Sequence, residues 1–206
     1  MAQETHLRLT PQQTNILGLK LKLELAQGII ELGGRTSIVR SICGISKASA
    51  LQLHREIWGE NPKAGMLPSD PEWLVKTPRN CVHSSIFYTI YTTLSACPDY
   101  SKAEIYLAAY RLYLDQIKGE DKIMLDINRA WQIVQQNSMN LLEGIQCSRC
   151  QLTHVAIKSY PKPYQYCPLC DSETDKMGRL KYKNFNVFSS KTDAKGRSGA
   201  ATAQIH

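Results

Sequence analysis

The first long apolar segment of the chain is LGLKLKLELAQGIIELGG, in which the leucines at positions 17, 19, 21, 23 and 25 alternate with other residues. Strict alternation is typical of a β-strand. Most residues between and after these leucines, however, are strong helix formers, and Leu25 and Ile29 follow one another at helical spacing. We therefore predict a helix over about residues 14–32, ended by the pair Gly33-Gly34.

The next segment, TSIVRSICGISKASALQLHREIWG, predicts two short helices around a break at Gly44. Ser46 is a good N-cap for the second helix, which we expect to run to about Trp58 and to stop at Gly59. Two helices around a tight turn are the arrangement of a helix-turn-helix. In that arrangement the buried positions would be Val39, Cys43, Ile45, Ala50 and Leu53.

The outward positions of the second helix would be Lys47, Ser49, Gln52 and Arg55. Their cationic, hydroxyl and amide groups can contact the phosphates and base edges of DNA. Arg40 stands where the motif usually has a small residue, and any amphipathic helical hairpin gives similar spacing. The pattern therefore leaves both DNA binding and plain helix packing open.

Residues 61–80 contain four prolines, which predict a long irregular connection. Residues 83–96 are rich in β-branched and aromatic side chains, but Phe87 and Tyr91 at i, i+4 favour a helix. The segments GMLPSDPEWL and HSSIFYTIY could form a partner-binding surface, because aromatic residues are enriched at interfaces. They could equally belong to the core and its connection.

Two further helices complete the predicted body. Ser101 and Glu104 form a possible capping box that opens the segment SKAEIYLAAYRLYLDQIKG. The last helix is predicted over about residues 120–141, because an apolar stripe recurs there at helical spacing. The residues of this stripe are Ile123, Ile127, Trp131 and Val134.

Two cysteine pairs, Cys147-x2-Cys150 and Cys167-x2-Cys170, are separated by sixteen residues. This spacing is typical of structural zinc sites, because each pair can place two thiolates on one side of a tight turn. Four thiolates fill a tetrahedral site, so we predict one structural Zn2+ that holds the local fold. His154 is a competing ligand, and the four cysteines could instead form a pair of disulfides or hold an iron–sulfur cluster.

The charge of the chain is uneven along its length. Residues 1–145 hold 15 Lys and Arg against 14 Asp and Glu, whereas residues 146–206 hold 10 against 4. This asymmetry indicates a polyanionic partner, most commonly nucleic acid, although a solvated tail would show it too. The candidate phosphate-contacting residues in this basic part are Arg149, Lys158, Lys162, Arg179, Lys181 and Lys183.

These features predict a mainly α chain with a helix-turn-helix-like segment in a helical body over residues 1–145. A small, basic, zinc-binding subdomain would follow over 146–188, and a flexible, disordered tail over 189–206. The first fifteen residues have no apolar core typical of a secretory signal, and no segment has the roughly 20 apolar residues of a membrane helix. We therefore expect a cytoplasmic protein with reduced thiols and no membrane partner.

We expect no enzymatic activity and no catalytic residue. The sequence contains no phosphate-cradling glycine loop. A nucleophile at Cys97, or at Cys81 with His83, has no surrounding pattern to support it. Cys43, Cys81 and Cys97 are interpreted as packing residues in apolar or loop settings.

Several segments taken in order resemble the FlhC family, the bacterial activators of flagellar genes. They are ELAQGIIELGGR, GISKASALQLHREIWGENPKAGMLPSDPEWL, HSSIFYTIY and AAYRLYLDQ, followed by the two cysteine pairs. The resemblance covers roughly residues 20–170, and the stretch RLKYKNFNVFSSKTDAKGR lies outside it.

This resemblance implies a mostly helical, cytoplasmic, DNA-binding activator that binds zinc through Cys147, Cys150, Cys167 and Cys170. It also implies a heterohexamer of two FlhC and four FlhD chains that recruits RNA polymerase to double-stranded promoter DNA of flagellar genes. Two different functions stay open. One is that of a zinc-ribbon adaptor that binds protein, and the second is that of a divergent paralog that regulates genes other than those for motility.

Overall fold

The computed structural model describes residues 11–160, 166–171, 173–174 and 180–181. The helices in this part of the chain are α1 (Pro11–Glu31), α2 (Thr36–Cys43), α3 (Lys47–Trp58), α4 (Trp73–Lys76), α5 (Pro78–Ser95), α6 (Lys102–Gln116) and α7 (Ile127–Ser138). The strands are β1 (Leu142–Gln146), β2 (Thr153–Ile157), β3 (Glu173–Thr174) and β4 (Leu180–Lys181). The predicted mainly α architecture is confirmed, while the predicted tail lies outside the described residues.

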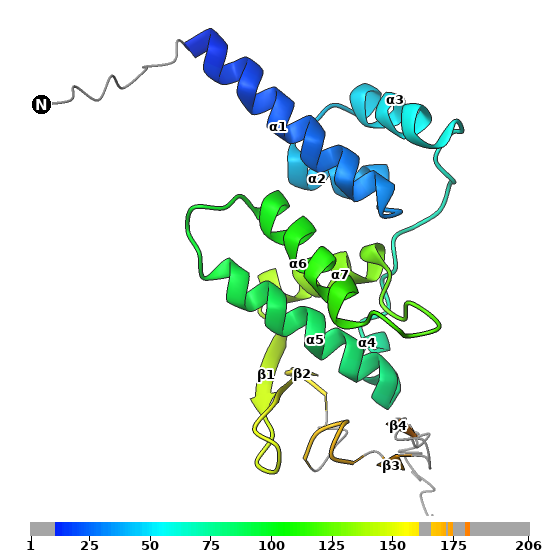
Figure 1. Cartoon of the computed structure of the whole chain (residues 1–206), viewed down its shortest axis with the longest axis vertical. Helices are drawn as coiled ribbons and strands as arrows, with labels where there is room; N and C mark the ends of the chain where they lie inside the picture. Colours follow the sequence, from blue (N-terminus) through cyan, green and yellow to red (C-terminus); the bar gives the residue numbers. More distant parts are fainter. Residues whose placement is uncertain (1–10, 161–165, 172, 175–179, 182–206) are drawn as a thin grey trace, which may run out of the picture.

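The elements follow one another along the long axis of the molecule (Figure 1). Helices α1, α2 and α3 pack together at one end, and α5, α6 and α7 form the middle. The antiparallel hairpin β1–β2 and the cysteine pairs lie at the other end. The two segments that the sequence selects for function therefore lie at opposite ends of the protein.

The predicted corner between α2 and α3 is confirmed in detail. Gly44 ends α2 with a φ of 65°, a left-handed conformation that glycine adopts without steric cost. The Ser46 hydroxyl then caps α3 by accepting a hydrogen bond from the backbone N–H of Ser49 at 3.0 Å. All five residues predicted to fill the corner are buried or partly buried: Val39, Cys43, Ile45, Ala50 and Leu53.

One asparagine joins this helical unit to the body. The Asn128 side chain on α7 accepts a hydrogen bond from the backbone N–H of Arg35 at 3.0 Å and donates one to the carbonyl of Gly33 at 3.1 Å. On the neighbouring side, Gly28 of α1 lies so close to α6 that a Cβ there would be 2.9 Å from Leu107. The α1–α3 unit is therefore packed directly on the body.

The core of the body is aromatic. Phe87 on α5 is fully buried, stacks on Tyr91 and meets the ring of Tyr110 on α6 edge to face. The capping box of Ser101 and Glu104 opens α6 as predicted. Phe87 and Tyr91 of the segment HSSIFYTIY therefore belong to the core.

Two predicted boundaries are wrong. The last helix begins at Ile127, because Asp126 caps it by accepting from the N–H groups of Asn128 and Arg129, and it ends at Ser138. Ile123, predicted on its apolar stripe, precedes the helix and is 52% exposed. The connection over 61–80 is also less irregular than predicted, since it contains α4 and the start of α5.

The sequence did not predict the hairpin β1–β2, which packs on α5 through a buried contact. The Ser85 hydroxyl on α5 accepts a hydrogen bond from the backbone N–H of Val155 at 2.9 Å and donates to the carbonyl of Cys81 at 2.6 Å. Further along, the Tyr160 hydroxyl donates to the Glu72 carboxylate at 2.8 Å. These contacts fix the base of the cysteine-bearing segment to the helical body.

Candidate metal centre and nucleic-acid interface

The four cysteines of the two predicted pairs meet in the folded chain. The Sγ atoms of Cys147, Cys150, Cys167 and Cys170 all lie within 4.8 Å of one another. The Sγ atoms of Cys150 and Cys167 are 3.6 Å apart, and those of Cys147 and Cys170 are 3.9 Å apart. These separations are well above the roughly 2.05 Å of a disulfide, and all seven cysteines are free thiols in the structure.

Two tight turns hold the sulfur atoms in place. The first joins β1 to β2, where the N–H of Gln151 donates to the carbonyl of Cys147 at 2.9 Å and Gln151 takes a φ of 62°. The second closes when the N–H of Cys170 approaches the Sγ of Cys167 at 3.3 Å. Each turn thus places both of its thiols on one side, as the Cys-x2-Cys spacing predicted.

The electrostatics of the cluster favour a bound cation. Burial raises the pKa of Cys147, but the backbone N–H groups of Cys150 and Arg149 and two neighbouring thiols outweigh it and lower the pKa to about 7. Burial, followed by the sulfur atoms around it, raises the pKa of Cys170 to about 12. One thiolate therefore forms readily, while further ones are disfavoured until a cation neutralises their repulsion.

The sulfur positions also fit a metal of the size of zinc. Four sulfurs placed about 2.3 Å from a central Zn2+ form a tetrahedron whose edges are about 3.8 Å long. Two of the six sulfur–sulfur separations, 3.6 and 3.9 Å, lie on either side of this length, and all six are within 4.8 Å. His154 is not among the residues whose ligand atoms converge. The cluster could therefore hold one metal ion through sulfur alone.

At the other end of the molecule, the predicted DNA-facing residues lie on two sides of α3. Lys47, Gln52 and Arg55 are exposed, and Ser49 is half-buried. Gln52 donates to the Glu56 carboxylate at 2.9 Å, and the Arg55 Nε donates to the Asn61 side chain at 2.7 Å. Ser49 and Gln52 line a groove shared with α1, whereas Lys47 and Arg55 do not.

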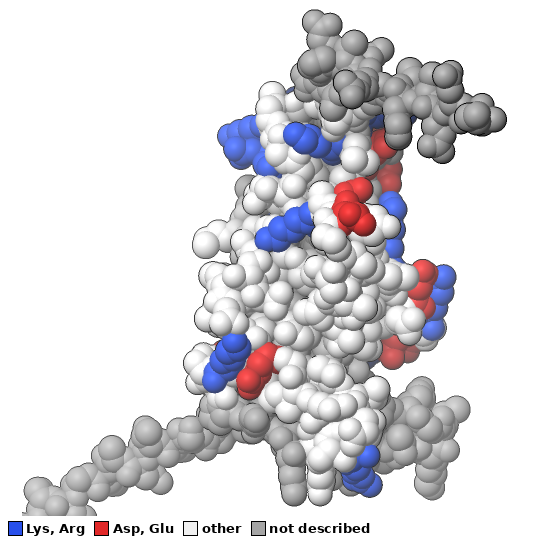
Figure 2. Space-filling view, turned by 90° about the vertical axis from the view of Figure 1, so that its left-hand side faces the viewer, with Lys and Arg blue, Asp and Glu red and all other residues white. Residues whose placement is uncertain are grey.

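The basic residues predicted near the cysteines are only partly described. Arg149 is exposed on the first cysteine turn, and Lys158 is exposed just after β2, where it donates to the Asn140 side chain. Lys181 lies in β4. Lys162, Arg179 and Lys183 lie outside the described residues. In the face shown in Figure 2, Lys and Arg side chains are visible toward both ends, with a broad uncharged area between them.

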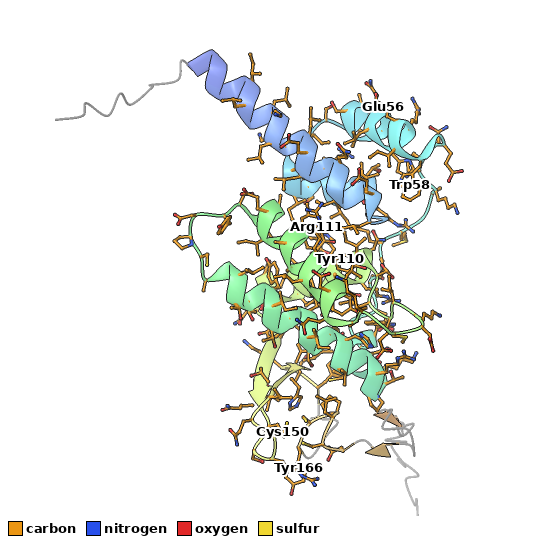
Figure 3. The ribbon with its side chains drawn as sticks, in the orientation of Figure 1. Glu56, Trp58, Tyr110, Arg111, Cys150 and Tyr166 are labelled. Atoms are coloured by element: carbon orange, nitrogen blue, oxygen red, sulfur yellow. The ribbon has the colours of Figure 1, made fainter. Side chains whose placement is uncertain are left out.

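Sequence reasoning missed a contact between the two cysteine turns. The guanidinium of Arg149 lies over the ring of Tyr166, 6.0 Å from its centroid, so a cation–π contact joins one turn to the other. Figure 3 shows Cys150 and Tyr166 together at this end and Glu56 on α3 at the other. The interleaving of basic and aromatic residues around the cysteines was the signal for this contact.

Two of the cysteines outside the cluster, Cys43 and Cys81, are buried thiols. Burial raises the pKa of Cys43 to about 11, and it is the largest cause that raises the pKa of Cys81 to about 12. A nucleophilic cysteine requires a lowered pKa instead. Cys97, interpreted as a packing residue, is instead exposed. The His83 ring contacts the Tyr113 hydroxyl through Nδ1 at 2.9 Å inside the core.

The chain is similar to proteins that regulate flagellar genes. The family model described as the flagellar transcriptional activator (FlhC) matches residues 12–183. A flagellar transcriptional regulator FlhC from Variovorax paradoxus is 33% identical over 157 residues, which are 76% of this chain and 77% of that protein. The protein of the same name from Yersinia enterocolitica is 30% identical over 179 residues, 85% of this chain and 92% of its own length. In the described part of the chain, no helix is long and apolar enough to cross a membrane.

Proposed function

Because the chain belongs to the FlhC family of flagellar transcriptional activators, we propose that it binds promoter DNA through basic elements at both of its ends. The corner between α2 and α3 carries this proposal. Its buried residues hold α3 across α2 in the manner of a helix-turn-helix, and Lys47 and Arg55 are exposed on the resulting surface. These side chains supply the contacts to phosphates and base edges.

The cysteine cluster supports the second element. We propose that it binds one structural Zn2+ through Cys147, Cys150, Cys167 and Cys170, because four thiolates leave no coordination position for a reacting group. When bound, the metal supplies the positive charge that lets all four sulfurs ionise. The segment around it then presents Arg149 and Lys158 to the phosphate backbone, with Lys162, Arg179, Lys181 and Lys183 as further candidates.

We also propose that the chain acts in a complex. The partner would be an FlhD-type subunit, in a heterohexamer of four FlhD-type chains and two chains of this protein, and the complex would recruit RNA polymerase in the cytoplasm. The family supports this proposal, and so does the apolar surface that α1 exposes.

The proposal is tested by fluorescence anisotropy with a labelled flagellar promoter fragment and a scrambled fragment of equal length. The full chain is titrated with and without the FlhD-type subunit of the same genome, at several salt concentrations. We expect a preference for the promoter that increases when the partner is present, and an affinity that falls steeply with salt. Equal, weak binding to both fragments under all conditions would instead support a protein-binding adaptor or a different operator.

A further inference from the structure

The N-terminal half of α1 exposes an unusual amount of apolar surface. Four large hydrophobic side chains within six residues are far from buried: Ile16 (69% exposed), Leu17 (50%), Leu19 (53%) and Leu21 (45%). This half of the helix extends away from the body (Figure 1), while its C-terminal half packs on α2, α3 and α6. Helices that are apolar on all sides are normally buried in a larger structure, so this half of α1 has the composition of an interface.

Part of this surface is the wall of a groove between α1 and α3. We call its apolar lining residues the floor and its polar lining residues the rims; the floor consists of Ile16, Leu19 and Leu23 of α1 and Leu53 of α3. The α1 rim carries Lys20 and Glu24, which pair with each other at 3.7 Å. The α3 rim carries Gln52 and Glu56, joined by their hydrogen bond. The groove is thus apolar along its floor and polar along both rims.

The shape and charge of the groove define its occupant. The α1 residues that line it run from Ile16 to Gln27, a length of about 18 Å at 1.5 Å per residue. Two antiparallel or crossing helices with an apolar floor between them accept a third helix of about three turns. Within the described residues Glu56 has no ion-pair partner, whereas Lys20 and Glu24 neutralise each other. A complementary helix therefore carries an apolar stripe and a Lys or Arg facing Glu56.

We propose that the α1–α3 groove binds an amphipathic helix of the partner subunit, with a basic side chain of that helix against Glu56. This inference rests on the proposed function in that it assumes a partner subunit. The inference also assigns different roles to the two sides of α3. At about 100° per residue, Lys47 lies on the far side of α3 from Ser49 and Glu56, while Arg55 lies between the two sides. One side of α3 then faces the partner and the other faces DNA, so Ser49 and Gln52 contact protein.

The experiment measures binding of the full chain to the FlhD-type subunit of the same genome by isothermal titration calorimetry. Leu19→Lys places a charge on the groove floor, and Glu56→Lys reverses the charge on its rim. Matched controls are Ile123→Lys and Asp121→Lys, the same types of change at exposed positions of the loop before α7. We expect about tenfold weaker binding for each groove variant, and binding within about twofold of wild type for each control.

Three results would overturn the inference, and each identifies a different error. Wild-type affinity in both groove variants means that the partner docks elsewhere, and the proposed function then stands. If the wild-type chain does not bind the FlhD-type subunit under any condition, the proposal that this subunit is its partner is wrong. Loss of concentration-dependent self-association in the groove variants, with partner binding unchanged, assigns the groove to a second copy of this chain. As an internal check on α3, Lys47→Ala should weaken DNA binding and leave partner binding unchanged.

Discussion

Cys167 contacts one cysteine of each turn of the cluster, Cys150 of the first and Cys170 of the second. Its sulfur lies 3.6 Å from that of Cys150 and accepts a contact from the N–H of Cys170 at 3.3 Å, so it connects the two turns. Replacing this sulfur with a hydroxyl removes one thiolate from a four-thiolate site. The remaining three ligands bind a divalent metal more weakly, and the energy that metal binding contributes to folding falls with them.

We predict that Cys167→Ser loses most of the zinc that the wild-type chain retains. The measurement is metal content per chain after exhaustive desalting, by inductively coupled plasma mass spectrometry. Cys43→Ser is the matched control, because Cys43 is also buried but lies in the corner between α2 and α3. Equal zinc content in Cys167→Ser and wild type would show that the cluster is not the metal site.

Ser85 has an equally local role at the base of the hairpin. Removing its hydroxyl leaves the buried N–H of Val155 without its 2.9 Å acceptor. An unsatisfied buried donor costs about 1–3 kcal/mol, so we predict that Ser85→Ala lowers the free energy of unfolding by that amount. Urea unfolding followed by circular dichroism gives the value. Thr93→Ala, at an exposed position of the same helix, should change it by less than about 0.5 kcal/mol.

At the scale of single residues, the sequence is most informative where spacing alone defines a local geometry. The Cys-x2-Cys pairs, the Ser46 cap and the Ser101–Glu104 capping box are set by residues within a few positions of one another, and the structure confirms the geometry of each. The contacts of Ser85 with Val155 and of Asn128 with Gly33 join residues far apart in the chain. No local pattern could indicate them, because they depend on how the helices pack.

At the scale of elements, the turn between α1 and α2 controls how the helix-turn-helix unit is held. Gly34 lies where a Cβ would be 2.4 Å from the Ile29 side chain and 2.6 Å from the Ile29 carbonyl oxygen. The backbone oxygen cannot move aside, so any side chain at this position must distort the turn. Position 34 therefore requires glycine, because the turn leaves no space for a Cβ atom.

We predict that Gly34→Ala destabilises the chain by about 1–3 kcal/mol, the range expected for overpacking. Gly18→Ala, inside α1 with nothing within 4 Å of the new Cβ, should instead stabilise it by about 0.5–1 kcal/mol, because alanine restricts the unfolded chain. Thermal unfolding of both variants beside wild type measures the two shifts. Shifts of the same sign would contradict the assignment of Gly34 to a crowded turn.

The elements that were predicted incorrectly have separate physical causes. Ile123 matches the spacing of the last helix, yet Asp126 caps that helix three residues later, and a cap takes precedence over an apolar pattern. The strands of the hairpin β1–β2 are short, and they are buried because they pack on α5, which their own sequence pattern does not indicate. By contrast, α1 was correctly predicted as a helix despite its alternating leucines, which give it apolar residues on several sides.

At the scale of the whole molecule, the decisive observation is that α3 and the cysteine cluster lie at opposite ends (Figure 1). A protein that uses both ends on one duplex contacts two separate stretches of phosphate backbone. The body between them then sets the distance between the contacts, and Asn128 and Ser85 hold the two ends to it. Contacts so far apart share no side chains, so their contributions to the free energy of binding should be independent.

We therefore predict that charge removal at the two ends is additive in DNA binding. Three variants each remove one charge: Lys47→Ala and Arg55→Ala on α3, and Arg149→Ala beside the cluster. In each of them the magnitude of the slope of log K against log salt should fall by about 0.9, the effect of one lost phosphate contact. The triple variant should lose the sum of the single free-energy changes within about 0.5 kcal/mol. Lys118→Ala is the control, because Lys118 is exposed but pairs with Asp115 at 2.6 Å. If Arg149→Ala changes neither affinity nor slope while the α3 variants change both, only the helix-turn-helix end contacts DNA, and the cluster has another partner.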